Sequence, residues 1–450
     1  MNHVTVMSLT ASVGLMAIFI VDFVDMIFIS MLGDSSLAAA IGYAGTILFI
    51  TSSISIGMSI AAGVMVARAL GKDDAELAAR SATNVATVGV ALALLVIVAV
   101  FVFMEPILSS IGATGESLTL AKTYLTILVP TMPIMMVAMI ANGLLRAHGD
   151  AKRAMYATLA GGIVNAALDP IFIFVLDMNL AGAAWASVAS RIAMLVFSIA
   201  PMIKIYSGFA RPSLSSTHAQ FRDIYALASP SVLANIASPI GASFVTKEMA
   251  KFGDDAVAGA AIIGRLTPVA FSVVFALSGA IGPIIGQNAG AGLSKRVKAA
   301  YWDAVKFTIY YVAAVSLLLF LLRAPIADLF DASGQKRDLI YLFCGPIALS
   351  YIFVGIIFVT NASFNNLNHP YYSTWINWGR NTLGTIIPIW ICAHFWGAPG
   401  ILIGQALGSL IFAIIAQALV SRIMSQTTVN VSHKPFTQHL RDHIMHMRNR

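Results

Sequence analysis

Long apolar runs separated by short polar stretches are the main pattern of this chain. Each run contains about 20 residues or more, the length that an α-helix needs to cross the hydrocarbon core of a bilayer. The runs fall at about 4–32, 40–67, 81–104, 117–145, 154–176, 180–203, 228–250, 257–286, 299–322, 339–364, 371–395 and 399–421. The pattern predicts an all-α polytopic membrane protein with twelve transmembrane helices.

The second half of the chain repeats the first in register. The markers are Ala67–Gly71 with Gly286–Gly290 at an offset of 219, Gly33-Asp34 with Gly253-Asp254 at 220, and Gly182 with Gly400 at 218. An even number of spans in each half makes the two repeats parallel, so a pseudo-twofold axis along the membrane normal relates them. We therefore expect an N-terminal lobe at 1–206, a cytoplasmic linker at 207–227, a C-terminal lobe at 228–425 and a cytoplasmic tail at 426–450.

The charged residues support a membrane protein and set its orientation. Only 10% of the residues are charged and 58% are hydrophobic, whereas soluble domains carry about 25% charged residues. Of the 27 Lys and Arg, 17 fall in the loops after even-numbered spans or in the tail, and six in the other loops. By the positive-inside rule both termini are cytoplasmic. The net charge of +7 therefore reflects topology, and no nucleic-acid partner is expected.

Three aspartates interrupt the predicted spans of the first half: Asp22, Asp25 and Asp169. A carboxylate at the bilayer centre costs roughly 2.5–3.5 kcal/mol on insertion scales, so such a residue is a functional candidate by default. The second half has no carboxylate at comparable depth. Two cysteines in apolar segments, Cys344 and Cys392, predict neither a disulfide nor a metal site.

Four polar side chains are expected at one depth in the first lobe. Asp25, Asp169, Tyr124 and Ser187 each lie eight residues inside the predicted outer end of a different span. Eight residues of helix rise about 12 Å, so the four side chains should share one layer. A group that can be charged or neutral at this depth suits proton coupling.

Further polar residues extend this layer. Asn165 lies one turn from Asp169 on the same helix face, and Arg191 one turn from Ser187. Thr51 and Ser55 belong to a hydroxyl stripe on the second span. We interpret the set as a network that holds Asp25 and Asp169 near their protonation threshold, with Asp22 a weaker member. The alternative is structural: the aspartates pair permanently with Arg191 or cap backbone groups.

Four segments resemble signatures of the multidrug and toxic compound extrusion (MATE) transporters. They are Asp25–Gly33, the run Asn165-Ala-Ala-Leu-Asp169-Pro-Ile-Phe, Gly182–Ala186 and Gly286–Gly292. The resemblance implies twelve helices in two lobes around a central cavity, and alternating-access export of drugs and organic cations in exchange for protons or sodium. It also places Asp25, Tyr124, Asn165, Asp169 and Ser187 in the coupling and substrate cluster of the first lobe.

The resemblance further implies a transporter without enzymatic activity, cofactor or bound metal. We expect a monomer in the lipid bilayer of a bacterial inner (plasma) membrane. Relatives coupled to sodium carry extra acids in the second lobe, whereas this chain has none between Asp338 and Asp442. That difference favours the DNA-damage-inducible-type, proton-coupled branch. Sodium coupling and a lipid-linked sugar or polysaccharide flippase remain alternatives.

One feature of the first span differs from relatives that are proposed to bend this helix at a proline. The chain has no proline before Pro106. A proline-driven kink is therefore excluded in the first span, although Gly14 permits a bend.

Overall fold

The regular elements of the protein are helices throughout the part that the computed structural model describes, residues 2–31, 35–110, 112–330 and 332–426. The first half contains α1 (Asn2–Met31), α2 (Ser35–Gly71), α3 (Ala75–Ser110), α4 (Gly115–Leu128), η1 (Val129–Thr131), α5 (Met132–Ala147), α6 (Ala151–Pro170), η2 (Ile171–Val175) and α7 (Asn179–Lys204). The second half contains α8 (Leu214–Ala250), α9 (Asp254–Ala270), α10 (Ser272–Gly290), α11 (Ser294–Leu329), α12 (Gly334–Leu342), η3 (Phe343–Ile347), α13 (Tyr351–Asn366), α14 (Pro370–Asn381), α15 (Leu383–Trp396) and α16 (Ala398–Gln426).

These helices supply the twelve expected spans. Ten segments of the described chain are long and apolar enough to cross a membrane unaided. The pair Gly334–Ile347 and Tyr351–Asn366, bent by 58°, makes an eleventh. The remaining expected span, 371–395, corresponds to the shorter helices α14 and α15, which meet end to end at Thr382.

Prolines account for several breaks within spans. Pro130 lies in the 3₁₀ turn between α4 and α5, Pro170 ends α6, and Pro346 lies in the turn between α12 and α13. A proline has no N–H to donate to the carbonyl four residues earlier, so the helix ladder is interrupted there. The α1 helix has no proline and is continuous from Asn2 to Met31, as the sequence predicts.

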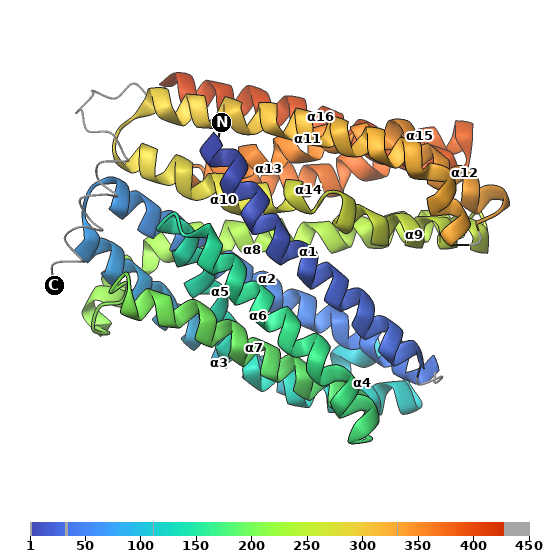
Figure 1. The fold of residues 1–450 in the computed structure, drawn as a ribbon, viewed down its shortest axis with the longest axis horizontal. Helices are drawn as coiled ribbons and strands as arrows, with labels where there is room; N and C mark the ends of the chain where they lie inside the picture. The colour runs from blue at the N-terminus through green and yellow to red at the C-terminus, as the bar shows by residue number, and fades with distance from the viewer. Residues whose placement is uncertain (1, 32–34, 111, 331, 427–450) are drawn as a thin grey trace.

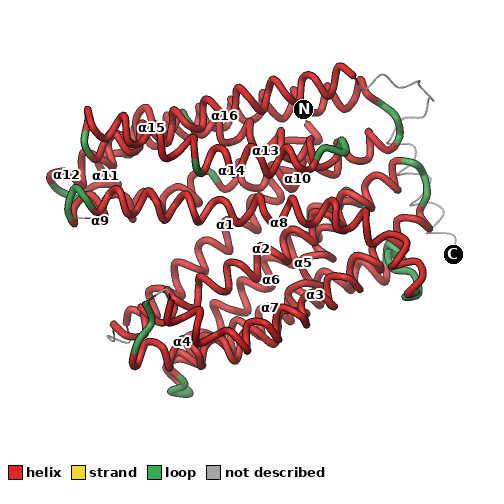
Figure 2. Tube along the Cα trace, turned by 180° about the vertical axis from the view of Figure 1, so that it is seen from behind, coloured by secondary structure: helices red, strands yellow, loops and turns green. Residues whose placement is uncertain are grey.

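The helices form two bundles that lie together at one end and diverge toward the other (Figures 1 and 2). The first bundle contains α2 to α7, and the second contains most of α9 to α16. Residues near the turns after Gly71, Ala147, Gly290 and Asn366 join the bundles, and we call this the basic end. By the positive-inside rule it is the predicted cytoplasmic end.

The first helix of each half packs against the opposite bundle. Val4 and Met7 of α1 belong to a core cluster with Leu277 and Ile281 of α10. Further along, α1 crosses to the first bundle, where a Cβ added at Gly14 would lie 3.3 Å from the Thr158 side chain of α6. The diagonal course of α1 is visible in Figure 1. It makes α1 a mechanical link between the bundles.

The α8 helix, the first of the second half, also packs against both bundles. Its Ile224 and Leu227 lie in the core of the first bundle, with α2, α3 and α5. Beyond Pro230 it is bound to α14 of the second bundle, because Thr374 donates to the Pro230 carbonyl at 2.8 Å and Trp378 to the Leu233 carbonyl at 3.0 Å. The two crossings preserve the pseudo-twofold relation of the halves.

The segment expected as a linker, 207–227, is partly helical. Helix α8 begins at Leu214, after the N-cap Ser213, whose Oγ accepts from the Ser216 N–H. Ser213, within the expected linker, is therefore a helix-capping residue. Asn84 of α3 donates to the Ser216 hydroxyl at 2.8 Å and to Gln220 at 2.9 Å, so this part of α8 is fastened to the first bundle. The lobe boundaries themselves stay a prediction.

Large apolar side chains cover the outer faces of the bundles. Leu95, Val102, Leu321 and Phe395 each expose more than half of their surface. A soluble protein rarely presents contiguous apolar area of this kind, whereas a lipid-facing surface requires it. The surface agrees with a multi-pass membrane protein.

Candidate functional site

A buried carboxylate and a buried amide form the centre of the candidate site. Asp169 and Asn165 lie one turn apart on α6, with 0% and 7% of their surface exposed. The Asn165 side-chain N–H donates to Asp169 Oδ2 at 2.6 Å. A hydrogen bond donated to a carboxylate favours its charged form, while burial favours the neutral form. The hydrogen bond from Asn165 and the burial of Asp169 therefore act in opposite directions on the ionisation of this carboxyl group.

The helix is irregular directly after Asp169. Pro170 cannot donate to the carbonyl four residues earlier, and a π-helical turn follows at Ile171–Val175. Gly182 of α7 packs against this turn, where an added Cβ would lie 2.7 Å from the Phe172 carbonyl oxygen. Single π-helical turns are frequent at functional sites. The acid thus lies at a point where α6 can change its backbone geometry.

A partly buried arginine forms a second polar centre, between α4, α5 and α7. The Arg191 guanidinium donates to the Leu128 carbonyl at 2.9 Å and to the Thr131 hydroxyl at 2.6 Å. The Leu128 carbonyl is available because the 3₁₀ turn redirects the Met132 N–H to Val129. A break in the fourth span thereby supplies the acceptors for a partly buried cation.

Tyr124 and Ser187 lie close to this second centre. Tyr124 packs against Ala184 and Val188 of α7, on either side of Ser187 in the sequence. Arg191 lies one turn from Ser187 on α7. The structure thus brings Tyr124, Ser187 and Arg191 to one region of the α4–α7 contact.

The other two predicted acids, Asp22 and Asp25, belong to the first helix. Asp22 and Asp25 lie within α1, which packs along α6, but their side chains lie outside the described residues. Their expected place beside Asp169 stays a prediction.

The hydroxyl stripe of α2 bonds mainly to carbonyls of its own helix. Thr51 donates to the Leu48 carbonyl and Ser55 to the Thr51 carbonyl, so both hydroxyls bond within their own helix. Only Ser59, one turn further, reaches another helix, donating to the Met139 carbonyl of α5 at 2.6 Å. These bonds show a packing role for the stripe. Participation of Thr51 and Ser55 in coupling stays a prediction.

Residues outside the predicted site form a third polar cluster in the first lobe. The Asn142 side chain donates to the Ala154 carbonyl at 2.9 Å and to the Thr158 hydroxyl at 3.2 Å, and accepts from Arg146 at 2.7 Å. This cluster joins α5 to α6 near the basic end. The sequence signal was an i, i+4 pair of polar residues, Asn142 and Arg146, late in the fourth span.

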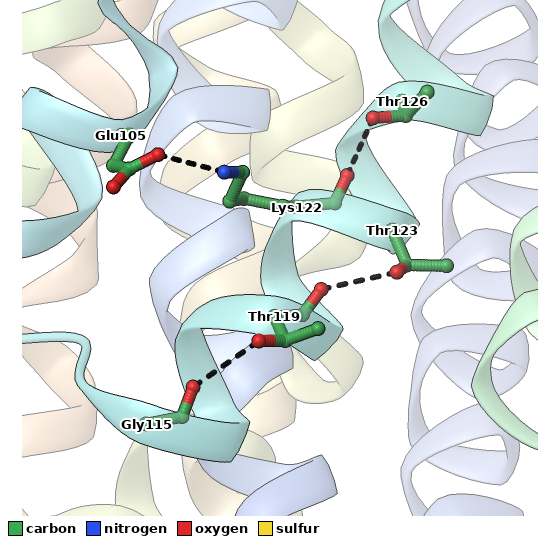
Figure 3. Close-up of polar contacts among 6 residues, drawn as sticks. All are labelled: Glu105, Gly115, Thr119, Lys122, Thr123 and Thr126. Carbon is green, nitrogen blue, oxygen red and sulfur yellow. Dashed lines mark hydrogen bonds and ion pairs between the residues drawn. The ribbon is translucent and has the colours of Figure 1, made fainter.

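Another acid of the first lobe has an ordinary surface environment. Glu105 of α3 is exposed and forms an ion pair with Lys122 of α4 at 2.7 Å (Figure 3). Beside it, Thr119, Thr123 and Thr126 donate to carbonyls of their own helix (Figure 3). Exposed ion pairs of this kind contribute little to stability and mark no special site. Glu105 is therefore unlike Asp169.

Comparison with known proteins gives the family. The MatE family profile matches residues 11–171 and 230–391, one match in each half. An FAD transporter of Shewanella oneidensis is 28% identical over 424 residues, covering 93% of both chains. The multidrug export protein MepA of Staphylococcus aureus (strain MSSA476) is 23% identical over 436 residues, covering 94% of both.

Solved structures show the same fold. A crystal structure of the Vibrio cholerae MATE transporter VcmN superposes with a TM-score of 0.88 at 22% identity, covering 94% of this chain and 98% of that one. A MOP superfamily transporter from Pyrococcus furiosus superposes with a TM-score of 0.86 at 22% identity, covering 94% and 96%. The twelve-helix, two-lobe architecture is therefore that of these transporters. The chain belongs to the MatE family, the multidrug and toxic compound extrusion transporters.

Proposed function

We propose that this protein is a secondary active multidrug efflux transporter that exchanges protons for cationic or amphipathic compounds by alternating access. The observation that carries the proposal is the fully buried Asp169, hydrogen-bonded by Asn165. Ionisable residues within membrane spans are costly and mark proton relays and substrate pathways. The similarity to the multidrug export protein MepA supports drug export.

The hydrogen bond from Asn165 to Asp169 links protonation of this carboxylate to the packing of α6. An ionised Asp169 accepts this N–H through Oδ2. Protonation removes the negative charge from the acceptor, so the hydrogen bond from Asn165 becomes weaker and the amide is held less firmly. Because Pro170 and the π-helical turn follow at once, a change here is transmitted to the packing of α6 against α1 and α7. In this scheme Asp25 and Asp22 of α1 join the same protonation step.

The energy of one proton is sufficient for export. Moving one charge through 100 mV is worth about 2.3 kcal/mol. A difference of one pH unit adds about 1.4 kcal/mol. The sum, about 3.7 kcal/mol, supports a gradient of a few hundredfold for a neutral compound at one-to-one exchange.

The second lobe favours protons over sodium as the coupling ion. Among the described residues, its acids include Glu248 near the end of α8 and Asp303 nine residues after the start of α11, and α13 to α16 contain none. A sodium site is built from several oxygen ligands, commonly with carboxylates. Because each chain contains both lobes, a monomer is the proposed working unit.

A second candidate is export of an anionic aromatic compound such as a dinucleotide. The Nε of Arg380, at the end of α14, is buried and has no hydrogen-bond acceptor among the described residues. Arg380 lies near Tyr351, which stacks on Phe271 at 4.2 Å. A guanidinium beside aromatic rings suits a phosphate attached to a planar ring system. The similarity to an FAD transporter supports this candidate.

Efflux from proteoliposomes tests both candidates. We expect a fluorescent organic cation to be transported when a proton gradient is imposed, and not when only a sodium gradient is imposed. Asp169→Asn should remove the proton-driven component, whereas Asp177→Asn, at an exposed position beyond α6, should not. Proton-driven efflux that survives Asp169→Asn contradicts the assignment. Transport of FAD in place of the cation, lost in Arg380→Gln, would establish the second candidate.

A further inference from the structure

Side chains of each lobe cap a helix of the other lobe at the basic end. Arg68, near the end of α2, donates through Nη2 to the Asn365 carbonyl at 2.7 Å and through Nε to the Asn366 carbonyl at 3.2 Å. Those carbonyls belong to the last two residues of α13. In the opposite direction, Gln287 of α10 donates to the carbonyl of Ala147, the last residue of α5, at 2.6 Å.

The internal repeat relates these two contacts. Arg68 and Gln287 are 219 residues apart, and so are Ala147 and Asn366. The pseudo-twofold axis that relates the lobes therefore maps the Arg68 contact onto the Gln287 contact. Two related contacts, one from each lobe, close the same end of the molecule.

The chemistry of helix ends explains why these bonds hold. The last four carbonyls of an α-helix have no partner within the helix and need an outside donor. Burial makes an unmet acceptor costly, and Gln287 exposes only 7% of its surface. A cation at a helix C-terminus also interacts favourably with the helix dipole, so Arg68 holds α13 more strongly than Gln287 holds α5.

Two glycines allow the contact to form. A Cβ added at Gly71 would lie 2.1 Å from the Gln287 carbonyl oxygen, and one at Gly290 would lie 2.2 Å from the Arg68 carbonyl oxygen. These glycines are also 219 residues apart. Because the opposing atoms are backbone, neither can move aside as a side chain would. The crossing of α2 and α10 at the basic end requires glycine on both helices.

We propose that Arg68 and Gln287 are the two halves of a gate at the basic end, which must break in every transport cycle before this end can open. The inference rests on the proposed transport by alternating access. The gate is chemically unequal, with two charge-assisted bonds on one side and one neutral bond on the other. Loss of Arg68 therefore opens this end more than loss of Gln287.

Distance measurements between spin labels test the gate directly. Labels at Lys72→Cys and Lys295→Cys, exposed positions at the basic end of the two lobes, would be introduced after replacing the buried Cys344 and Cys392 by alanine. We expect Gly71→Ala and Gly290→Ala to shift the main distance to longer values. Arg68→Ala should produce a larger open population than Gln287→Ala.

The matched control is Gly63→Ala on α2, two turns before Gly71. A Cβ there would meet its nearest atom, the Gly143 carbonyl oxygen, at an ordinary 3.8 Å. This variant should keep the parent distance. Unchanged distances in Gly71→Ala, Arg68→Ala and Gln287→Ala would overturn the gate, as would an equal shift in Gly63→Ala. If Gly71→Ala does not fold, the two side-chain variants decide.

The readout separates the gate from the proposed function. The distances are measured without substrate or proton gradient, so failure of proton-driven transport leaves the gate test intact. Conversely, if the protein transports by proton exchange but the distance between the two labels is the same in all variants, the gate alone is refuted.

Discussion

Corresponding positions of the two lobes carry opposite chemistry at mid-span. Asn165 and Asp169 of α6 correspond, at the offset of 219, to Gly384 and Pro388 of α15. The first lobe buries a hydrogen-bonded polar pair at these positions. The second lobe has a close helix contact, because a Cβ at Gly408 of α16 would lie 1.6 Å from the Gly384 carbonyl oxygen. One repeat thus holds a titratable group where the other holds tight packing.

The partly buried arginines of the two lobes differ in the same way. Arg191 in the first lobe has two hydrogen bonds across the α4–α7 contact. Arg380 in the second lobe has a buried Nε without an acceptor in the described part of the chain. A satisfied buried cation stabilises the fold, whereas an unsatisfied one is costly unless a ligand meets it. The comparison favours a structural role for Arg191 and supports the proposed binding role of Arg380.

The largest expected effect concerns the acid of the first lobe. Asp169→Asn should reduce proton-driven efflux to the level of liposomes without protein, because the amide cannot carry the coupled proton. Pro388→Ala, at the corresponding position of the second lobe, should keep most of the activity. The measurement is the initial efflux rate at an imposed pH difference. Equal losses in the two variants would show that the lobes do not differ in coupling.

The packing of the second lobe gives the next largest effect. Gly408→Ala should lower the free energy of unfolding by about 3 kcal/mol, since the added methyl overlaps backbone that cannot move aside. Gly45→Ala in α2, where a Cβ meets nothing within 4 Å, is the control and should change it by less than about 0.5 kcal/mol. Thermal unfolding of the purified protein in detergent measures both. If Gly408→Ala leaves the free energy of unfolding unchanged, the close packing of Gly408 against Gly384 does not distinguish the second lobe from the first.

The two arginines give a smaller and more selective difference. Arg191→Met should destabilise the protein by about 2 kcal/mol, because two hydrogen bonds from a charged donor are lost and only the bond from the Thr131 hydroxyl to the Leu128 carbonyl, at 2.7 Å, remains. Arg380→Met should leave stability unchanged or raise it, since it removes an unsatisfied buried group. Chemical denaturation in mixed micelles compares the two. Equal destabilisation would mean that Arg380 has a structural role as well.

The smallest effect is expected at the basic end, outside the spans. The Tyr206 hydroxyl donates to Asp150 Oδ2 at 2.7 Å. Burial and this hydrogen bond raise the pKa of Tyr206 above its usual value, so the donor persists at all physiological pH values. Tyr206→Phe should lower the free energy of unfolding by about 1 kcal/mol. This loss should be the same at every pH between about 6 and about 9. A loss that appears only on one side of that range would contradict this.

Much of the fold was predictable because its signals are local. Apolar runs of span length gave the spans, and register of Ala67–Gly71 with Gly286–Gly290 gave the two lobes. The close pairing of Asn165 with Asp169 followed from helix periodicity alone. The helical start of α8 within the expected linker was missed, because Ser213 and its neighbours suit both a linker and a helix cap.

The sequence by itself determined the family, the twelve spans and the position of a buried acid in the first lobe, since these depend on hydrophobicity and spacing along one helix. Only the tertiary structure decided the partners of Arg191, the diagonal course of α1 and the reciprocal caps by Arg68 and Gln287. Each of these joins residues from helices that are distant in sequence. These contacts depend on how the helices pack and on where the helices are interrupted. The hydrophobic pattern of a single span predicts neither the packing nor the position of the interruptions.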